Sequence, residues 1–131
     1  MYPYALIAHS LLRWVVLALA VLAAVSALGP LAGIRRRLLP FVIALDLQVI
    51  VGLALWISLS PVTSFSGGAL GDVEARHFTM VHPAMGAAAV VLAHTANVFL
   101  KRGFPQAKVL LWLALAAVLL AVPWGRPMLR L

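Results

Sequence analysis

The sequence predicts an all-α fold, a transmembrane up-down four-helix bundle, from its composition and from the spacing of its apolar runs. Hydrophobic residues make up 65% of the 131-residue chain, charged residues only 10%, and the mean hydropathy is +1.10. A soluble domain carries about 25% charged residues, so most of this surface is expected to face a lipid bilayer. A chain of this length is expected to form a single domain, residues 1–131.

Four apolar runs are the expected spans. A membrane helix needs about 20 apolar residues, with a range of about 17–25, and the fourth run lies at the short end of that range. Each run is bounded by proline or glycine, which usually end helices. The alternating segments of about ten residues that mark a membrane β-barrel are not present. The expected spans cover residues of about 4–28, 39–60, 78–100 and 107–122.

The basic residues predict the orientation of the bundle. Six lie between spans one and two or between spans three and four, and three lie on the opposite side. Because short cytoplasmic loops are enriched in Lys and Arg, we expect a multi-pass protein of the bacterial inner (cytoplasmic) membrane with both termini outside. A longer outer loop is expected over residues 61–76. The inner set is Arg35, Arg36, Arg37, Lys101, Arg102 and Lys108, and the outer set is Arg76, Arg126 and Arg130.

Charge and composition exclude several classes of function. The net charge is +7, but the basic residues form short clusters between apolar runs, which is a topology signal and not a nucleic-acid patch. The chain has no cysteine, so disulfides and thiolate metal sites are excluded. Asp72 and Glu74 fall in the expected outer loop, and no hydrolytic motif is present. Whether the protein is an enzyme stays open.

Two histidines are expected at the same depth on facing helices. His9 is about five residues into the first span and His82 about four into the third, both counted from outside, at a rise of about 1.5 Å per residue. Short loops make consecutive helices antiparallel neighbours, so spans one and three should lie on a diagonal. Two imidazoles placed in this way suit the two axial positions of a haem iron. The alternative is that each histidine bonds a backbone carbonyl or interfacial water.

Three further ionisable residues inside the spans are candidate site residues, because such residues are costly in lipid. Arg13 follows His9 by one turn on the same face, where it could pair with a haem propionate or with Asp46; the alternative is that it snorkels. Asp46 and His94 are expected to meet in the inner half of adjacent spans. They could form a proton site, half of a second cofactor site or a quinone pocket, or a buried pair that only fixes helix register.

Four short motifs are spread along the chain: His9-Ser10-Leu11-Leu12-Arg13-Trp14, Asp46-Leu47-Gln48 with Gly52, Arg76-His77-Phe78-Thr79-Met80-Val81-His82-Pro83, and Val122-Pro123-Trp124. Together they resemble a family of small bacterial four-helix membrane proteins, some of them described as cytochrome b-like. The resemblance covers nearly the whole chain, and it implies that His9, His82 and His94 are candidate ligands and Arg13 a site residue. Members of that family carry His at the position of Asp46, so this chain departs from the pattern of a second, inner bis-histidine haem.

Two functions of different classes remain. The first is electron transfer by a b-type cytochrome that holds haem b between His9 and His82, exchanges electrons with a quinone, and needs a redox partner or a larger membrane complex. The second is a non-redox accessory or assembly subunit of a membrane complex, whose polar residues serve packing. A proton or small-solute path along Arg13, Asp46 and His94 is a third. An optical spectrum of the oxidised and dithionite-reduced protein separates the first from the others.

Overall fold

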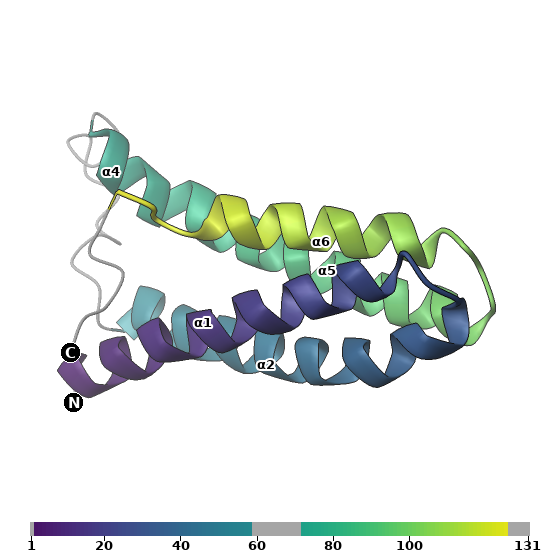
Figure 1. Cartoon of the computed structure of the whole chain (residues 1–131). Helices are drawn as coiled ribbons and strands as arrows, with labels where there is room; N and C mark the ends of the chain where they lie inside the picture. Colours follow the sequence, from purple (N-terminus) through teal and green to yellow (C-terminus); the bar gives the residue numbers. More distant parts are fainter. Residues whose placement is uncertain (1, 59–71, 126–131) are drawn as a thin grey trace.

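The computed structural model describes residues 2–58 and 72–125, and within these ranges all regular structure is helical. Four long helices run alternately up and down (Figure 1), so the predicted all-α four-helix bundle is confirmed. A short helix, α4, and a π-helical turn, η2, lead without a break into the third long helix. The elements are α1 (Tyr2–Ser26), α2 (Leu31–Ser58), α4 (Val73–Arg76), η2 (His77–Val81), α5 (His82–Lys101) and α6 (Ala107–Ala121).

The four long helices pack in the cyclic order α1, α2, α5, α6. Extensive contacts join α1 to α2, α2 to α5, α5 to α6 and α6 to α1. Helices α1 and α5 therefore lie on a diagonal, as the short connections predict. The beginning of α1 and the end of α6 share one end of the bundle, here called the terminal end (Figure 1). The α1–α2 and α5–α6 connections share the opposite end, here called the turn end.

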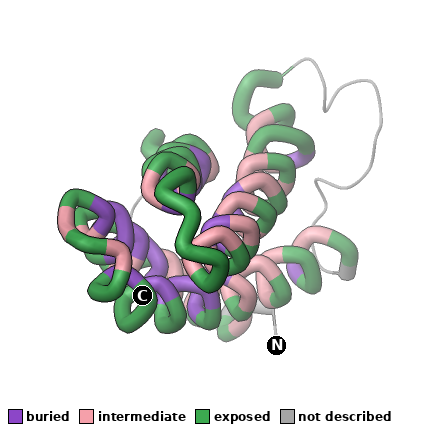
Figure 2. Tube along the Cα trace, turned by 90° about the vertical axis from the view of Figure 1, so that its right-hand side faces the viewer, coloured by how far each residue is buried: buried purple, intermediate pink, exposed green. Residues whose placement is uncertain are grey.

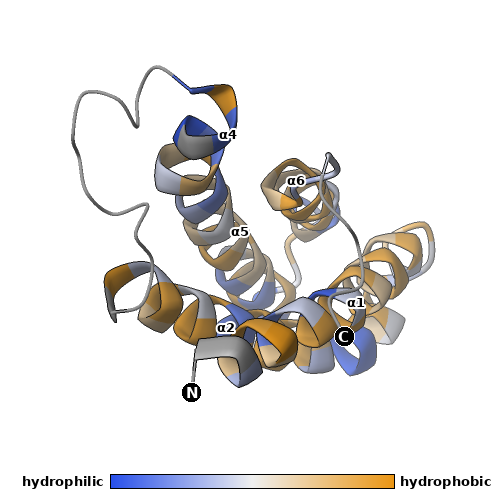
Figure 3. Ribbon diagram, turned by 90° about the vertical axis from the view of Figure 1, so that its left-hand side faces the viewer, coloured by the Kyte–Doolittle hydropathy of each residue, from blue (hydrophilic) through white to orange (hydrophobic). Residues whose placement is uncertain are grey.

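Three helical stretches are long and apolar enough to cross a membrane: Tyr4–Ser26, Leu31–Ile57 and His77–Lys101. Exposed residues cover the outward sides of these helices (Figure 2), and many of them are hydrophobic (Figure 3). Such a surface suits a lipid bilayer. Helix α6 is apolar but has only 15 residues, or about 22 Å, so the fourth predicted span stays a prediction.

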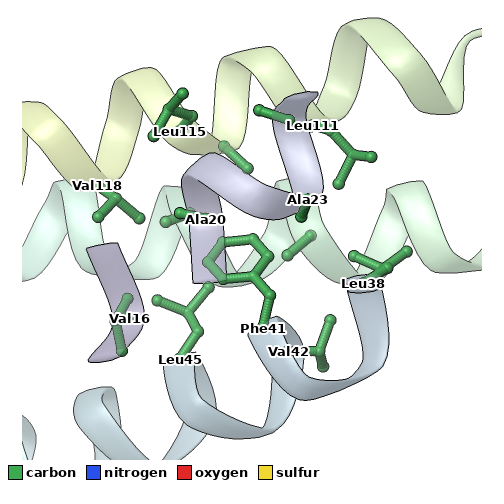
Figure 4. Close-up of a cluster of buried hydrophobic side chains, with 14 of the residues drawn as sticks. Val16, Ala20, Ala23, Leu38, Phe41, Val42, Leu45, Leu111, Leu115 and Val118 are labelled. Carbon is green, nitrogen blue, oxygen red and sulfur yellow. The ribbon is translucent and has the colours of Figure 1, made fainter. Parts of the chain in front are cut away.

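The tightly packed core lies toward the turn end. Its largest fully buried side chains are Phe41, Ile34, Leu38 and Leu111, and Figure 4 shows Phe41 surrounded by side chains from α1, α2 and α6. Buried alanines line the facing helices, as Ala20 and Ala23 do on α1. Small residues let membrane helices approach closely, so the large side chains of α2 and α6 fill the remaining space.

Two connections are shorter than the sequence predicts. Helix α2 begins at Leu31 and not near residue 39, so the three arginines 35–37 form an exposed helical turn instead of a loop. Arginine is a good helix former and proline suits a helix start, so Gly29-Pro30 suffices for the turn. Val73–Arg76 is likewise helical. The rest of the predicted outer loop, residues 61–71, lies outside the described residues, as do the two C-terminal arginines 126 and 130.

Lys108 has a structural role that its use as a topology signal does not suggest. Its Nζ donates a hydrogen bond of 2.7 Å to the backbone oxygen of Gly29, just beyond the end of α1. Carbonyl groups at a helix C-terminus lack intrahelical partners, and a lysine ammonium is a suitable donor for them. Lys108 therefore ties the start of α6 to the end of α1.

Candidate functional site

A cavity of about 220 Å³ lies between the four long helices, in the half of the bundle nearer the terminal end. Most of its lining is apolar, and its polar lining residues include His9, Arg13, Gln48 and His82. Three of the predicted site residues, His9, Arg13 and His82, are therefore brought together around one space. The small residues Gly86 and Ala89, one and two turns from His82, also line it.

His9 and His82 face each other across the diagonal of the bundle. Their ring centroids are 5.9 Å apart and their planes are inclined at 72°. His9 comes from the first half of α1, whereas His82 is the first residue of α5. The depth match expected from the sequence is therefore present in three dimensions.

One ring nitrogen of His82 is held by the end of α6. Its Nδ1 lies 2.6 Å from the backbone oxygen of Ala121, and since a carbonyl only accepts, Nδ1 carries the hydrogen. In a neutral imidazole the lone pair is then on Nε2. The Ala121 carbonyl is open to a side chain because α6 ends here: Val122 is extended, so no later backbone N–H continues the helix to bond it.

His9 makes a corresponding contact with α2. Its Nε2 lies 3.3 Å from Nε2 of Gln48, with the amide as the donor. Its Nδ1 is buried and has no hydrogen-bond partner among the described residues, and the same holds for Oε1 of Gln48. Because an amide offers a donor on one side and an acceptor on the other, Gln48 can serve either tautomer of His9. In both cases one ring nitrogen of His9 forms the hydrogen bond with Gln48 and the other ring nitrogen does not.

Gly52 makes room for the His9 ring. A Cβ atom at this position would lie 2.8 Å from His9 Cε1, closer than two carbon atoms can pack. Gln48 and Gly52 are one helical turn apart, as are His9 and Arg13, so two pairs with a spacing of four build one wall of the cavity. Sequence reasoning identified Gln48 and Gly52 only as parts of a motif and not as site residues, and this spacing is the signal that could have found them.

A π-helical turn positions His82, and sequence reasoning missed it. The backbone N–H of His82 bonds the carbonyl of His77, five residues back. The following residue, Pro83, has no N–H to bond the Thr79 carbonyl, which favours an irregular turn at this point. The turn brings the His77 ring to 6.2 Å from the His82 ring. Such single π-turns are frequent at functional sites.

Asp46 and His94 pair as predicted, but not inside the bundle. Nε2 of His94 lies 3.0 and 3.1 Å from the two carboxylate oxygens of Asp46. The side chains are 49% and 36% exposed for His94 and Asp46 respectively, so the expected interior position is wrong. The buried residues Leu45 and Ala93 precede them, and the next residue of a helix is rotated by about 100°, which turns both members of the pair outward.

The donor set at the cavity suits a haem iron. Within the described residues, no group of three or more His, Cys, Asp or Glu side chains could hold a metal ion, whereas a haem needs only two axial ligands from the protein. The cavity of about 220 Å³ exceeds the roughly 150 Å³ that admits benzene and is below the about 300–1,000 Å³ of a pocket for a drug-sized ligand. The cavity is therefore smaller than a macrocycle requires, and its walls would have to move apart to hold one. Comparison of the chain with models of known families, with curated proteins and with solved structures gave no significant match.

Proposed function

We propose that the protein is a membrane b-type cytochrome that holds one haem between His9 and His82 and transfers electrons. The observation that supports this is the imidazole pair on diagonal helices, with ring centroids 5.9 Å apart. A nitrogen of imidazole binds a metal at about 2 Å, so two rings on opposite sides of one iron have centroids about 6 Å apart. The separation of the two rings therefore already approaches that of a pair of axial ligands.

Other residues of the chain would hold His9 and His82 in place and contact the edge of the haem. The Ala121 carbonyl fixes the orientation of His82, as carbonyls commonly do for ligating histidines. Gln48 holds His9 from the side of α2. Arg13 lines the same cavity and is the candidate partner of a propionate. When bound, haem supplies one-electron chemistry, and the apolar lining of the cavity tunes its potential.

The orientation and the exchange partner are part of the same proposal. The arginines 35–37, Lys101 and Arg102 are exposed at the turn end, so the rule for cytoplasmic loops places that end in the cytoplasm. The haem would then lie toward the outer surface of the bacterial inner membrane, with both termini outside. A bilayer quinone and a separate redox partner would exchange electrons with it. A C-terminal reporter that is active only in the cytoplasm should be silent, and strong activity would overturn this topology.

An optical spectrum tests haem binding directly. Protein made with ample haem should show a Soret band and a six-coordinate, low-spin spectrum. His9→Ala and His82→Ala should each abolish the low-spin form while the protein still inserts. The controls are His94→Ala, because His94 lies on the outer face, and His77→Ala; both should keep the spectrum. If wild-type protein shows no Soret band, or both ligand variants keep it unchanged, the accessory-subunit function becomes the better explanation.

A further inference from the structure

The lipid-facing side of α2 and α5 carries a hydrogen-bonded polar pair among apolar side chains. Asp46 and His94 bridge the two helices. Exposed hydrophobic side chains surround the pair on both helices. These side chains and the pair together are here called the α2/α5 face. These side chains are Ile43, Leu47 and Ile50 on α2, and Val91 and Val98 on α5.

The α2/α5 face lies at the depth of the hydrocarbon. Asp46 is nine residues beyond Arg37 (46 − 37) and His94 is seven residues before Lys101 (101 − 94). At 1.5 Å per residue the pair is about 11–14 Å from the basic residues of the turn end, within a hydrocarbon layer about 30 Å thick. Ionisable side chains at such depth almost always face protein or a water-filled cavity. A polar partner that covers the pair is therefore expected.

The chemistry of the pair is complementary to itself. Nε2 of His94 is engaged by Asp46, so a ring that carries both hydrogens would present its second N–H at Nδ1, and the carboxylate retains unused lone pairs. A bilayer also holds two copies of one chain in the same orientation and at the same depth. A two-fold axis along the membrane normal would thus set the His94 of each copy beside the Asp46 of the other, which is the reciprocal contact of a symmetric dimer.

We propose that the α2/α5 face is the interface of a homodimer, in which the Asp46–His94 pairs of two copies form one closed four-residue network. The exposed small residues Ala84 and Ala87 continue this face along α5 and allow close helix approach. Polar side chains that bond across the interface add to such packing in membranes. This proposal does not depend on haem binding.

Cysteine cross-linking tests the interface, because the chain has no cysteine of its own. Val91→Cys places a thiol on the α2/α5 face, and Leu120→Cys is the matched control on α6, with exposures of 64% and 62% respectively. Oxidation in native membranes should give at least about ten-fold more dimer from Val91→Cys than from Leu120→Cys. Equal cross-linking of the two variants, or no dimer from Val91→Cys, would overturn the proposal.

Variants of the pair then test its role. Both variants of the pair are made in the Val91→Cys protein, which is the parent here. The double substitution Asp46→Leu/His94→Leu removes both polar groups and leaves no charge alone in lipid, so the protein should fold but cross-link much less. The exchange Asp46→His/His94→Asp keeps the self-complementary chemistry and should restore cross-linking. If the double leucine variant cross-links like the parent, or if added quinol abolishes cross-linking of the parent, the pair serves another ligand and the dimer proposal is wrong.

Discussion

The turn end and the terminal end of the bundle differ in how the same four helices pack. Toward the turn end, Phe41, Leu38 and Ile34 are almost completely buried. Figure 4 shows Phe41 inside a cluster of apolar side chains. Toward the terminal end, the helices leave a cavity lined by His9 and His82. Stability in a helical protein need not be uniform, and functional regions are drawn from its less stable parts. The dense half therefore holds the helices in register while the other half leaves space for a ligand.

Buried polar atoms without a hydrogen-bond partner also distinguish the terminal half of the bundle from the dense half. His9 Nδ1, Gln48 Oε1 and His77 Nε2 are buried without a hydrogen-bond partner among the described residues, and all three belong to the terminal half. Each such atom costs about 1–3 kcal/mol. Proteins keep such unpaired buried atoms at functional sites, where the rest of the fold supplies the stability that they cost. A ligand with its own polar groups or a metal would relieve part of this cost.

The largest expected effect comes from opening the dense half. Phe41→Ala removes a side chain that is almost fully buried and should lower the free energy of unfolding by about 3–5 kcal/mol. The matched control is Phe104→Ala, since Phe104 is exposed at the turn end; its cost should stay below about 1.5 kcal/mol, the value of its ring contact with Phe99. Equilibrium unfolding in mixed micelles measures both. Equal losses would contradict the role given to the buried core of the dense half.

Gly52→Ala should damage the terminal half more locally. The added Cβ would meet His9 Cε1 at 2.8 Å, so the imidazole must move, at a cost of about 1–3 kcal/mol. Under the proposed function, the low-spin spectrum should weaken as well. Gly86→Ala is the control on the same cavity: its Cβ would meet only Val49 Cγ2, at 3.7 Å, and alanine is favoured over glycine in a helix by about 1 kcal/mol. Opposite signs in unfolding experiments are therefore expected, and equal signs would contradict the role given to Gly52.

The cavity and the Asp46–His94 pair show what the sequence can and cannot predict. The four helices, the diagonal relation of α1 and α5, and the common depth of His9 and His82 follow from hydropathy, loop length and residue counts. The start of α2 at Leu31 was missed because charged residues in a helix that extends past the membrane look like a loop in hydropathy. The outward position of Asp46 and His94 was missed because depth fixes the level of a residue but not the rotation of its helix. That rotation depends on how Leu45 and Ala93 pack in the core.

The π-turn before His82 and the Gln48–His9 contact depend on details that periodicity does not carry. Pro83 removes one helical hydrogen bond, which is visible in the sequence. How the backbone responds to the missing bond is decided by the packing of Phe78 and His77 around His82. The candidate ligands could thus be predicted from the sequence, whereas the residues that orient them required the three-dimensional structure.

The smallest expected effect comes from the hydrogen bond between Lys108 and Gly29 at the turn end. Lys108→Met removes the ammonium that bonds the Gly29 carbonyl at 2.7 Å and keeps a side chain of similar helix propensity. Because the carbonyl can turn to water at this half-buried site, the loss should be about 1 kcal/mol, the usual net value of one hydrogen bond. Lys101→Met is the control, because Lys101 is exposed and a surface substitution changes stability by less than about 0.5 kcal/mol. Unfolding under the conditions used for Phe41→Ala puts both on one scale. If Lys108→Met lowered the free energy of unfolding as much as Phe41→Ala, the main source of stability would be the link between α1 and α6 and not the packed interior.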